Sequence, residues 1–255
     1  MPFTVSHAVA ALPFVRTPLV PAALVIGTMT PDLPYFTPLP IELRDSTHTA
    51  LGIVTIDLLI GTIVLLAWWF VARAPVIDLA PAWIRERMPD RTPIVGLKSV
   101  ALIAASLAIG IATHVVWDLF THDGPVAEVL LLNTQLGPLE VHKWLQHGSS
   151  AVGLAVLAWW AARWVRRTGR SPRVAVASVS TRRAAWIVTA STFVLFALWV
   201  WGVGILIGNA PFDPGLVFFI ARVSIGATVL VAAGCCGLWY LARAISRYRR
   251  PRPQS

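Results

Sequence analysis

Five long apolar runs constrain this chain more than any other feature of its sequence. They cover residues 51–72, 97–120, 149–165, 184–208 and 216–242. A helix needs about 20 mainly apolar residues to cross a bilayer. Only 13% of the residues are charged and 56% are hydrophobic, whereas soluble domains carry about 25% charged residues. The sequence therefore predicts an all-α, polytopic membrane protein with about five transmembrane helices.

Basic residues gather in blocks between these runs and predict the orientation of the chain. The formal net charge is +9, which in a soluble protein would suggest binding to nucleic acid. Here the blocks are typical of cytoplasmic loops beside anionic lipid headgroups, and they lie at 73–96, 163–183 and 243–255. We therefore expect a multi-pass protein of the plasma (inner) membrane with a cytoplasmic C-terminus, and membrane lipids rather than nucleic acid as partners. The segments that would face outward are 1–50, 121–148 and 209–215.

Residues 1–50 are apolar but interrupted by prolines and by Arg16. We expect two short helices here, one ending near Phe14 and one from about Pro18 to Gly27, because proline is tolerated in a first helical turn. Neither piece is long enough to span a bilayer, so both would pack at the outer face. A single span over residues 8–27 is the alternative.

His114, Asp118 and His122 follow one another at intervals of four residues at the end of the second apolar run. Residues four apart lie on one face of a helix, so the three side chains form one stripe. Two imidazoles and a carboxylate on one face are able to bind a metal such as zinc. The alternative interpretation is a polar helix end at the membrane surface, with the histidines as interface residues.

All of the histidines fall in segments that are expected to face outward; they are His7, His48, His114, His122, His142 and His147. Asp32, Asp118 and Glu140 lie among them. Zinc hydrolases use mixed histidine and carboxylate ligands and keep an open position for water, whereas a bare histidine pair between helices would suggest haem. Asp57, inside the first run, is either a partner of a nearby histidine or a group facing water between helices.

Several motifs occur in a fixed order: Met1-Pro2-Phe3-Thr4-Val5-Ser6-His7, Pro31-Asp32, Thr47-His48, His114-x-x-x-Asp118-x-x-x-His122 and Leu145-Gln146-His147-Gly148-Ser149-Ser150. With them the sequence resembles an uncharacterised membrane-protein family, domain of unknown function 4184, mainly over residues 1–165. The same order is similar to that of membrane-bound metal-dependent hydrolases and, more distantly, of the zinc-dependent phospholipase C and nuclease group. That second resemblance implies a multi-zinc site that cleaves phosphoesters.

The resemblance also implies a set of site residues. The implied metal ligands are His7, Asp32, His48, His114, Asp118, His122 and His147, with His142 as an alternative to His147. Asp118 and Asp32 would be the catalytic carboxylates. A late His-x-x-x-Glu pair of the distant group falls on His142 and Gln146 here, and glutamine is a poor zinc ligand. A further metal would therefore need Glu140 as a substitute.

Together these features predict the domain organisation and two classes of function. Residues 1–165 would form a metal-site membrane domain with three spans, followed by a basic cytoplasmic loop at 166–183, a two-helix hairpin at 184–242 and a basic tail at 243–255. The first hypothesis is a zinc-dependent hydrolase of a phosphoester or lipid at the extracytoplasmic face. The second is a non-enzymatic membrane scaffold or metal-binding accessory protein. A transporter is disfavoured because the ionisable residues gather at one membrane edge.

Overall fold

The computed structural model describes residues 4–37, 42–90 and 96–248, and most of them are helical. The first elements are short: η1 (Thr4–Phe14), α1 (Pro21–Gly27), η2 (Thr30–Phe36) and α2 (Glu42–Thr47). The first two, η1 and α1, correspond to the two short helices that were expected, and no continuous helix runs through residues 8–27. η2 and α2 are two further short helices of the same segment. The only strands in these described ranges, β1 (Gln135–Leu136) and β2 (Leu139–Glu140), pair antiparallel.

Four helices are long and apolar enough to cross a membrane, which confirms the expected all-α membrane fold. The first, Ala50–Leu79, is built from α3 (Ala50–Gly52), η3 (Ile53–Asp57), α4 (Leu58–Ala67), η4 (Trp68–Ala72) and α5 (Arg73–Leu79). The others are α7 (Gly96–Thr121), α10 (Val179–Leu206) and α11 (Pro214–Tyr248). The remaining helices are α6 (Ala82–Arg85), α8 (Pro125–Val129) and α9 (Val141–Arg167).

The apolar run at residues 149–165 lies within α9, which is not one of these four helices. With 27 residues, α9 is about 40 Å long and has the length of a span. The hydropathy of α9 is lower than that of the four spanning helices because of its composition. Polar residues occupy its first turns, and Trp159, Trp160 and Arg163 lower the hydropathy near its end. One side of α9 packs on η1 and α7, so protein rather than lipid covers part of its surface.

The chain divides by its internal contacts into two compact units. Unit 1 comprises Met1–Leu66 and Pro89–Thr168, and unit 2 comprises Ala67–Met88 and Gly169–Ser255. The long helix Ala50–Leu79 contributes to both units. The finer boundaries at 165, 183 and 242 stay a prediction from the sequence.

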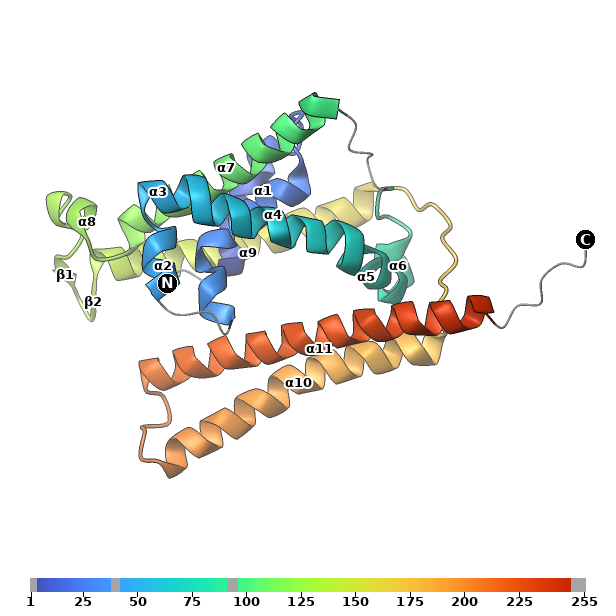
Figure 1. The fold of residues 1–255 in the computed structure, drawn as a ribbon. Coiled ribbons are helices and arrows are strands. Elements are labelled where there is room, and N and C mark those ends of the chain that lie inside the picture. Colours follow the sequence, from blue (N-terminus) through green and yellow to red (C-terminus); the bar gives the residue numbers. More distant parts are fainter. Residues whose placement is uncertain (1–3, 38–41, 91–95, 249–255) are drawn as a thin grey trace, which may run out of the picture. The chain divides into compact units, whose positions relative to one another are not determined.

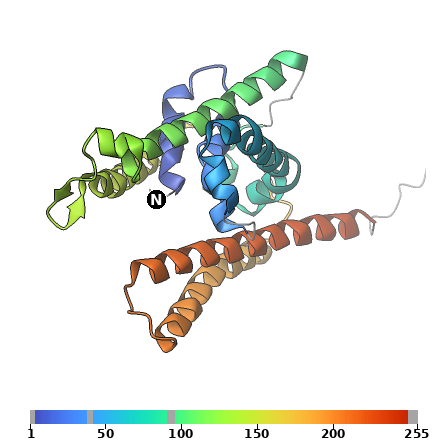
Figure 2. The ribbon, with the colours of Figure 1, turned by 60° about the vertical axis from the view of Figure 1, so that its left-hand side comes forward.

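In unit 1, the N-terminal helices pack on α7, and Figures 1 and 2 show α1 beside it. Leu24 of α1 and Ile111 of α7 are buried in this contact. Gly27 and Gly110 let the two backbones approach closely. A Cβ atom on Gly27 would meet the carbonyl oxygen of Leu107, and one on Gly110 would meet that of Leu24. The end of α1 is thereby held against α7 one turn before the histidine stripe.

In unit 2, α10 and α11 form an antiparallel hairpin, which both ribbon views show (Figures 1 and 2). Asp78 of α5 ties the segment before α10 to this hairpin. Its carboxylate accepts hydrogen bonds from the backbone N–H groups of Val176 and Ala177, at 2.6 and 2.9 Å, and from Nε1 of Trp239 at 2.7 Å. α11 continues to Tyr248, into the expected basic tail, and residues 249–255 lie outside the described residues.

Candidate metal centre

Four side chains from three separate parts of unit 1 meet at one point. His114 and Asp118 lie one turn apart on α7, Asp32 comes from η2, and His48 follows directly after α2. Each offers one ligand atom, and these atoms all lie within 4.8 Å of one another. Asp32, His114 and Asp118 are buried and His48 is half-buried. The helical spacing explains only the pair on α7, because the packing of η2 and α2 brings in the other two residues.

Three of the distances between these atoms are within about 0.1 Å of those between ligands of a single tetrahedral metal ion. Nε2 of His48 and Nε2 of His114 each lie 3.5 Å from Oδ2 of Asp118, and Nε2 of His114 lies 3.7 Å from Oδ1 of Asp32. Two ligands bound tetrahedrally to zinc, each at about 2.0–2.2 Å, are separated by about 3.3–3.6 Å. The same distances are longer than the usual 2.7–3.2 Å of a hydrogen bond. The spacing therefore fits a shared cation better than direct pairing.

Hydrogen bonds on the far side of each imidazole orient the two histidines. Nδ1 of His114 donates to the carbonyl oxygen of Thr28 at 2.8 Å. The hydroxyl of Thr47 donates its single proton to the carbonyl of Pro31 at 3.0 Å, so Nδ1 of His48, 3.1 Å from that hydroxyl, acts as the donor between them. In the neutral form of each ring, Nε2 then carries a lone pair that points toward the carboxylates, as in histidine ligands of metals.

A hydrogen bond also orients the carboxylate of Asp32. Oδ2 of Asp32 accepts a 2.7 Å hydrogen bond from the hydroxyl of Thr4, which leaves Oδ1 toward the cluster. Among the described residues, Oδ1 of Asp32, Oδ1 of Asp118 and Nε2 of His114 are buried and have no hydrogen-bond partner. Burying such atoms unpaired costs several kcal/mol. A divalent cation would satisfy them together, so the residues present fit a metal.

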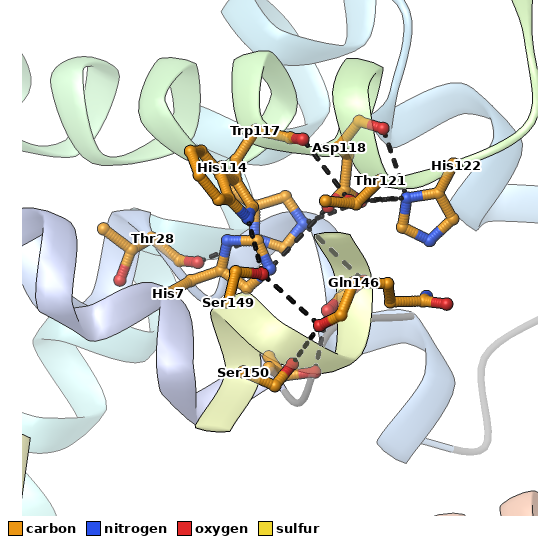
Figure 3. Close-up of polar contacts among 12 residues, drawn as sticks. His7, Thr28, His114, Trp117, Asp118, Thr121, His122, Gln146, Ser149 and Ser150 are labelled. Atoms are coloured by element: carbon orange, nitrogen blue, oxygen red, sulfur yellow. Dashed lines mark hydrogen bonds and ion pairs between the residues drawn. The ribbon is translucent and has the colours of Figure 1, made fainter. Parts of the chain in front are cut away.

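Two further histidines approach Asp118. Nε2 of His7, from η1, lies 3.7 Å from Oδ1 of Asp118, and the ring of His7 stacks on that of His114 with centroids 4.0 Å apart. Nδ1 of His122 lies 3.6 Å from Oδ2 of Asp118. Figure 3 shows the rings of His7 and His114 side by side and His122 on the other side of Asp118. Asp118 thus stands among four histidines, with its two oxygens facing different ones, and this arrangement suits a carboxylate that bridges two cations.

The protonation states outside the spanning helices also suit metal binding. Burial, with the nearby His114 as the next cause, lowers the pKa of His7 to about 3. Burial likewise lowers the pKa of His122 to about 4. Both imidazoles are therefore neutral at neutral pH and have a lone pair to offer. Burial raises the pKa of Asp32, because it disfavours the charged form of the carboxylate.

The structure does not bring every implied ligand to the cluster. His147 is exposed on α9. His142 is buried, but its Nδ1 lies 3.3 Å from the carbonyl of Leu132 and its Nε2 3.5 Å from Oε2 of Glu140, so it belongs to the β-hairpin region. Asp57 is fully buried, and neither of its oxygens has a hydrogen-bond partner among the described residues.

Several residues at the site have no role predicted from the sequence. Thr4 and Thr47 lie inside the motifs Thr4-x-x-His7 and Thr47-His48, but their spacing gave no sign that they orient Asp32 and His48. Gln146, predicted to be a poor ligand, is buried with its Nε2 atom unpaired among the described residues. Its neighbour His147 points elsewhere because adjacent residues on a helix lie about 100° apart.

A pocket of about 470 Å³ opens beside the cluster. His48, Asp118 and His122 line it, so it reaches the candidate ligands directly. The other lining residues come from the end of α7, the start of α8 and α9: Val115, Leu119, Asp123, Gly124, Pro125, Val126 and Lys143. Ligand sites typically have volumes of about 300–1,000 Å³, and this pocket falls within that range.

The comparisons with known proteins point to a family without assigning an activity. The family described as Domain of unknown function (DUF4184) matches residues 1–240, which include every residue of the cluster. No curated protein and no solved structure matches the chain.

Proposed function

The chain belongs to this family of unknown function (DUF4184), and we propose that it is a metal-dependent hydrolase of phosphoesters or lipids at the extracytoplasmic face of the membrane. The cluster would hold zinc or another divalent metal through His48, His114, Asp32 and Asp118. His7 and His122 would complete the coordination or hold a second ion. Mixed imidazole and carboxylate ligands are the set that zinc hydrolases use.

One observation carries this proposal. The buried lone pairs of two imidazoles and two carboxylates converge within 4.8 Å, and each is turned inward by a hydrogen bond behind it or by its helix. Atoms that only accept hydrogen bonds repel one another in an interior of low dielectric constant. A positive charge among them would therefore stabilise the arrangement, and a divalent cation bound by all four groups would supply it.

A bound divalent metal supplies Lewis-acid polarisation of the substrate and makes a coordinated water more acidic. The chain's own residues would accept the proton and hold the reacting groups in position. Asp118 would accept the proton of the attacking water, since its Oδ1 atom has no hydrogen-bond partner in the described part of the chain and its Oδ2 atom is the one nearest His48 and His114. The hydrogen bonds from Thr4 to Asp32 and from His114 to Thr28 would keep both groups in place during that transfer.

The proposed orientation follows from the basic segments. Residues 73–96 and 163–183 carry most of the arginines outside the tail and would lie in the cytoplasm. Two segments on the same side of the membrane are separated by an even number of crossings. α7 and α9 are the long helices between residues 73–96 and 163–183, so both segments are cytoplasmic only if α9 crosses the membrane as α7 does. The cluster, at the C-terminal end of α7, would then face the outside.

A metal-binding accessory protein without catalysis is the second candidate. The near-complete burial of Asp32 and His114 favours it, because structural metal sites are closed. The pocket that reaches His48 and Asp118 favours the hydrolase, because a catalytic site needs an open position.

Metal content of the detergent-purified full chain tests the proposal. We expect wild-type protein to hold at least one zinc ion after zinc loading, and Asp118→Asn and His114→Ala to lose it. His147→Ala is the matched comparison, because this histidine is exposed and should leave the metal in place. Wild-type protein without metal after loading would rule the proposal out.

A screen of phosphoester and lipid substrates then separates the two candidates. Hydrolysis by the metal-loaded wild type that disappears in Asp118→Asn would support the hydrolase. Stoichiometric metal without release of product from any substrate would support the accessory protein.

A further inference from the structure

We propose that Lys143 and the metal cluster hold a phosphate group between them in the adjacent pocket, and that this phosphate is the headgroup of a membrane lipid. The inference rests on the proposed function, because it assumes that the cluster carries a metal ion. It adds a residue that binds substrate and an approach route from the bilayer surface.

Lys143 is the only lysine or arginine among the residues that line the pocket. It lies in the first turn of α9 and is half-buried, and the described residues offer it no ion pair. A half-buried ammonium group that lines a pocket and has no ion pair in the described part of the chain suits an anionic ligand.

The chemistry of the pocket favours an oxyanion with several oxygens. A phosphate is able to bind an ammonium group with one oxygen and a metal ion with another. The other carboxylate that lines the pocket, Asp123, is engaged by Nδ2 of Asn133 at 2.8 Å. Asp123 therefore has a hydrogen-bond partner of its own, which leaves Lys143 as the positive group available to a ligand.

The remainder of the pocket is apolar. Val115, Leu119 and Val126 line it, and about 470 Å³ is far more than a single phosphate occupies. Beyond it, Val129, Leu130 and Leu131 at the end of α8 are 80%, 51% and 72% exposed. Exposed apolar groups of this kind mark contact with another apolar phase. We infer that this edge contacts the bilayer and that the ligand's apolar part lies along the pocket wall.

Chemical labelling of the wild-type protein tests the inference, because the chain has only two lysines, Lys143 and Lys98. Lys98 is exposed near the other end of α7, about 24 Å along the helix from His114, and serves as the internal control. The zinc-loaded full chain is acetylated with a lysine-specific reagent in detergent, and both sites are quantified by mass spectrometry. The three probes are inorganic phosphate, dihexanoyl phosphatidic acid and dihexanoylglycerol.

We expect both phosphate compounds to protect Lys143 and leave Lys98 unchanged. The phosphatidic acid should act at a concentration at least about tenfold lower, because its chains add apolar contact, and dihexanoylglycerol should not protect. Equal potency of the two phosphate compounds would overturn the lipid part and indicate a soluble phosphate ligand. No protection by either compound in protein that holds zinc would overturn the inference and leave the metal site intact.

Variants give a second measurement that does not depend on the reactivity of Lys143. Calorimetric titration of zinc-loaded protein with inorganic phosphate should show at least about tenfold weaker binding in Lys143→Gln, recovery in Lys143→Arg and no change in Lys98→Gln. Unchanged phosphate binding in Lys143→Gln would contradict the assignment. Wild-type protein without zinc would contradict the proposed function first, and this inference with it.

Discussion

Nδ1 of His114, in the middle of unit 1, donates a 2.8 Å hydrogen bond to the main-chain carbonyl of Thr28, 86 positions earlier in the chain. This bond fixes the tautomer of His114 and turns its Nε2 atom toward Asp32 and Asp118. It exists because α1 ends against α7, where Gly27 and Gly110 allow the two backbones to touch. The geometry of the candidate metal centre therefore depends on a helix contact that contains no ligand.

Substitution of Gly110 tests this dependence. A Cβ atom at this position would overlap the carbonyl oxygen of Leu24, so Gly110→Ala should push α1 away and misplace Thr28. We expect a loss of stability of about 1–3 kcal/mol and weaker zinc binding, measured by thermal unfolding and zinc titration in detergent. Gly148→Ala is the control, because a Cβ atom there would meet nothing within 4 Å. Equal zinc affinity in Gly110→Ala and wild type would show that the contact does not position the site.

The hydroxyl of Thr4 offers a test of the carboxylate's orientation. Thr4→Val keeps the shape of the side chain but removes the 2.7 Å hydrogen bond to Oδ2 of Asp32. Loss of such an orienting partner typically lowers metal affinity about 10–100-fold, and zinc titration against a chelator would measure it. Thr17→Val removes an exposed hydroxyl just after η1 and should leave the affinity unchanged. An unaltered affinity in Thr4→Val would exclude the orienting role.

The buried histidines predict how the stability of the metal-free protein depends on pH. His7 has a pKa of about 3 in the folded protein and about 6.5 when unfolded. Between these two pKa values the imidazole of His7 is protonated in the unfolded state but not in the folded state. The free energy of unfolding is therefore unaffected above pH 6.5 and falls as the pH decreases toward 3. The slope from His7 is at most about 1.4 kcal/mol per pH unit, and His122, with a pKa of about 4, adds a smaller part because it is more exposed.

Thermal unfolding of chelator-treated protein between pH 7.5 and 4.5 measures this effect. His7→Gln should flatten the decline, whereas His147→Gln, at an exposed position, should not. A melting temperature that stays constant or rises on acidification in the wild type would contradict the burial of neutral His7.

How much of the site was predictable differs from residue to residue. Spacing along one helix predicts His114, Asp118 and His122 on a common stripe, and in the structure both histidines lie beside Asp118. His7, Asp32 and His48 were implied only by the order of motifs, because no local rule states where separate short segments will pack. His147 was implied in the same way, yet it lies exposed while its neighbour Gln146 is buried.

The sequence by itself determined the membrane class of this protein, because long apolar runs are stable as helices in lipid whatever their neighbours are. It also determined that the candidate pair His114 and Asp118 shares one face of α7, because helical periodicity is a local property of the backbone. Only the tertiary structure decided which other residues join that pair. Asp32 and His48 reach Asp118 through contacts between η2, α2 and α7. Such contacts depend on how side chains fit together between segments far apart in the sequence, and helical periodicity does not predict this fit.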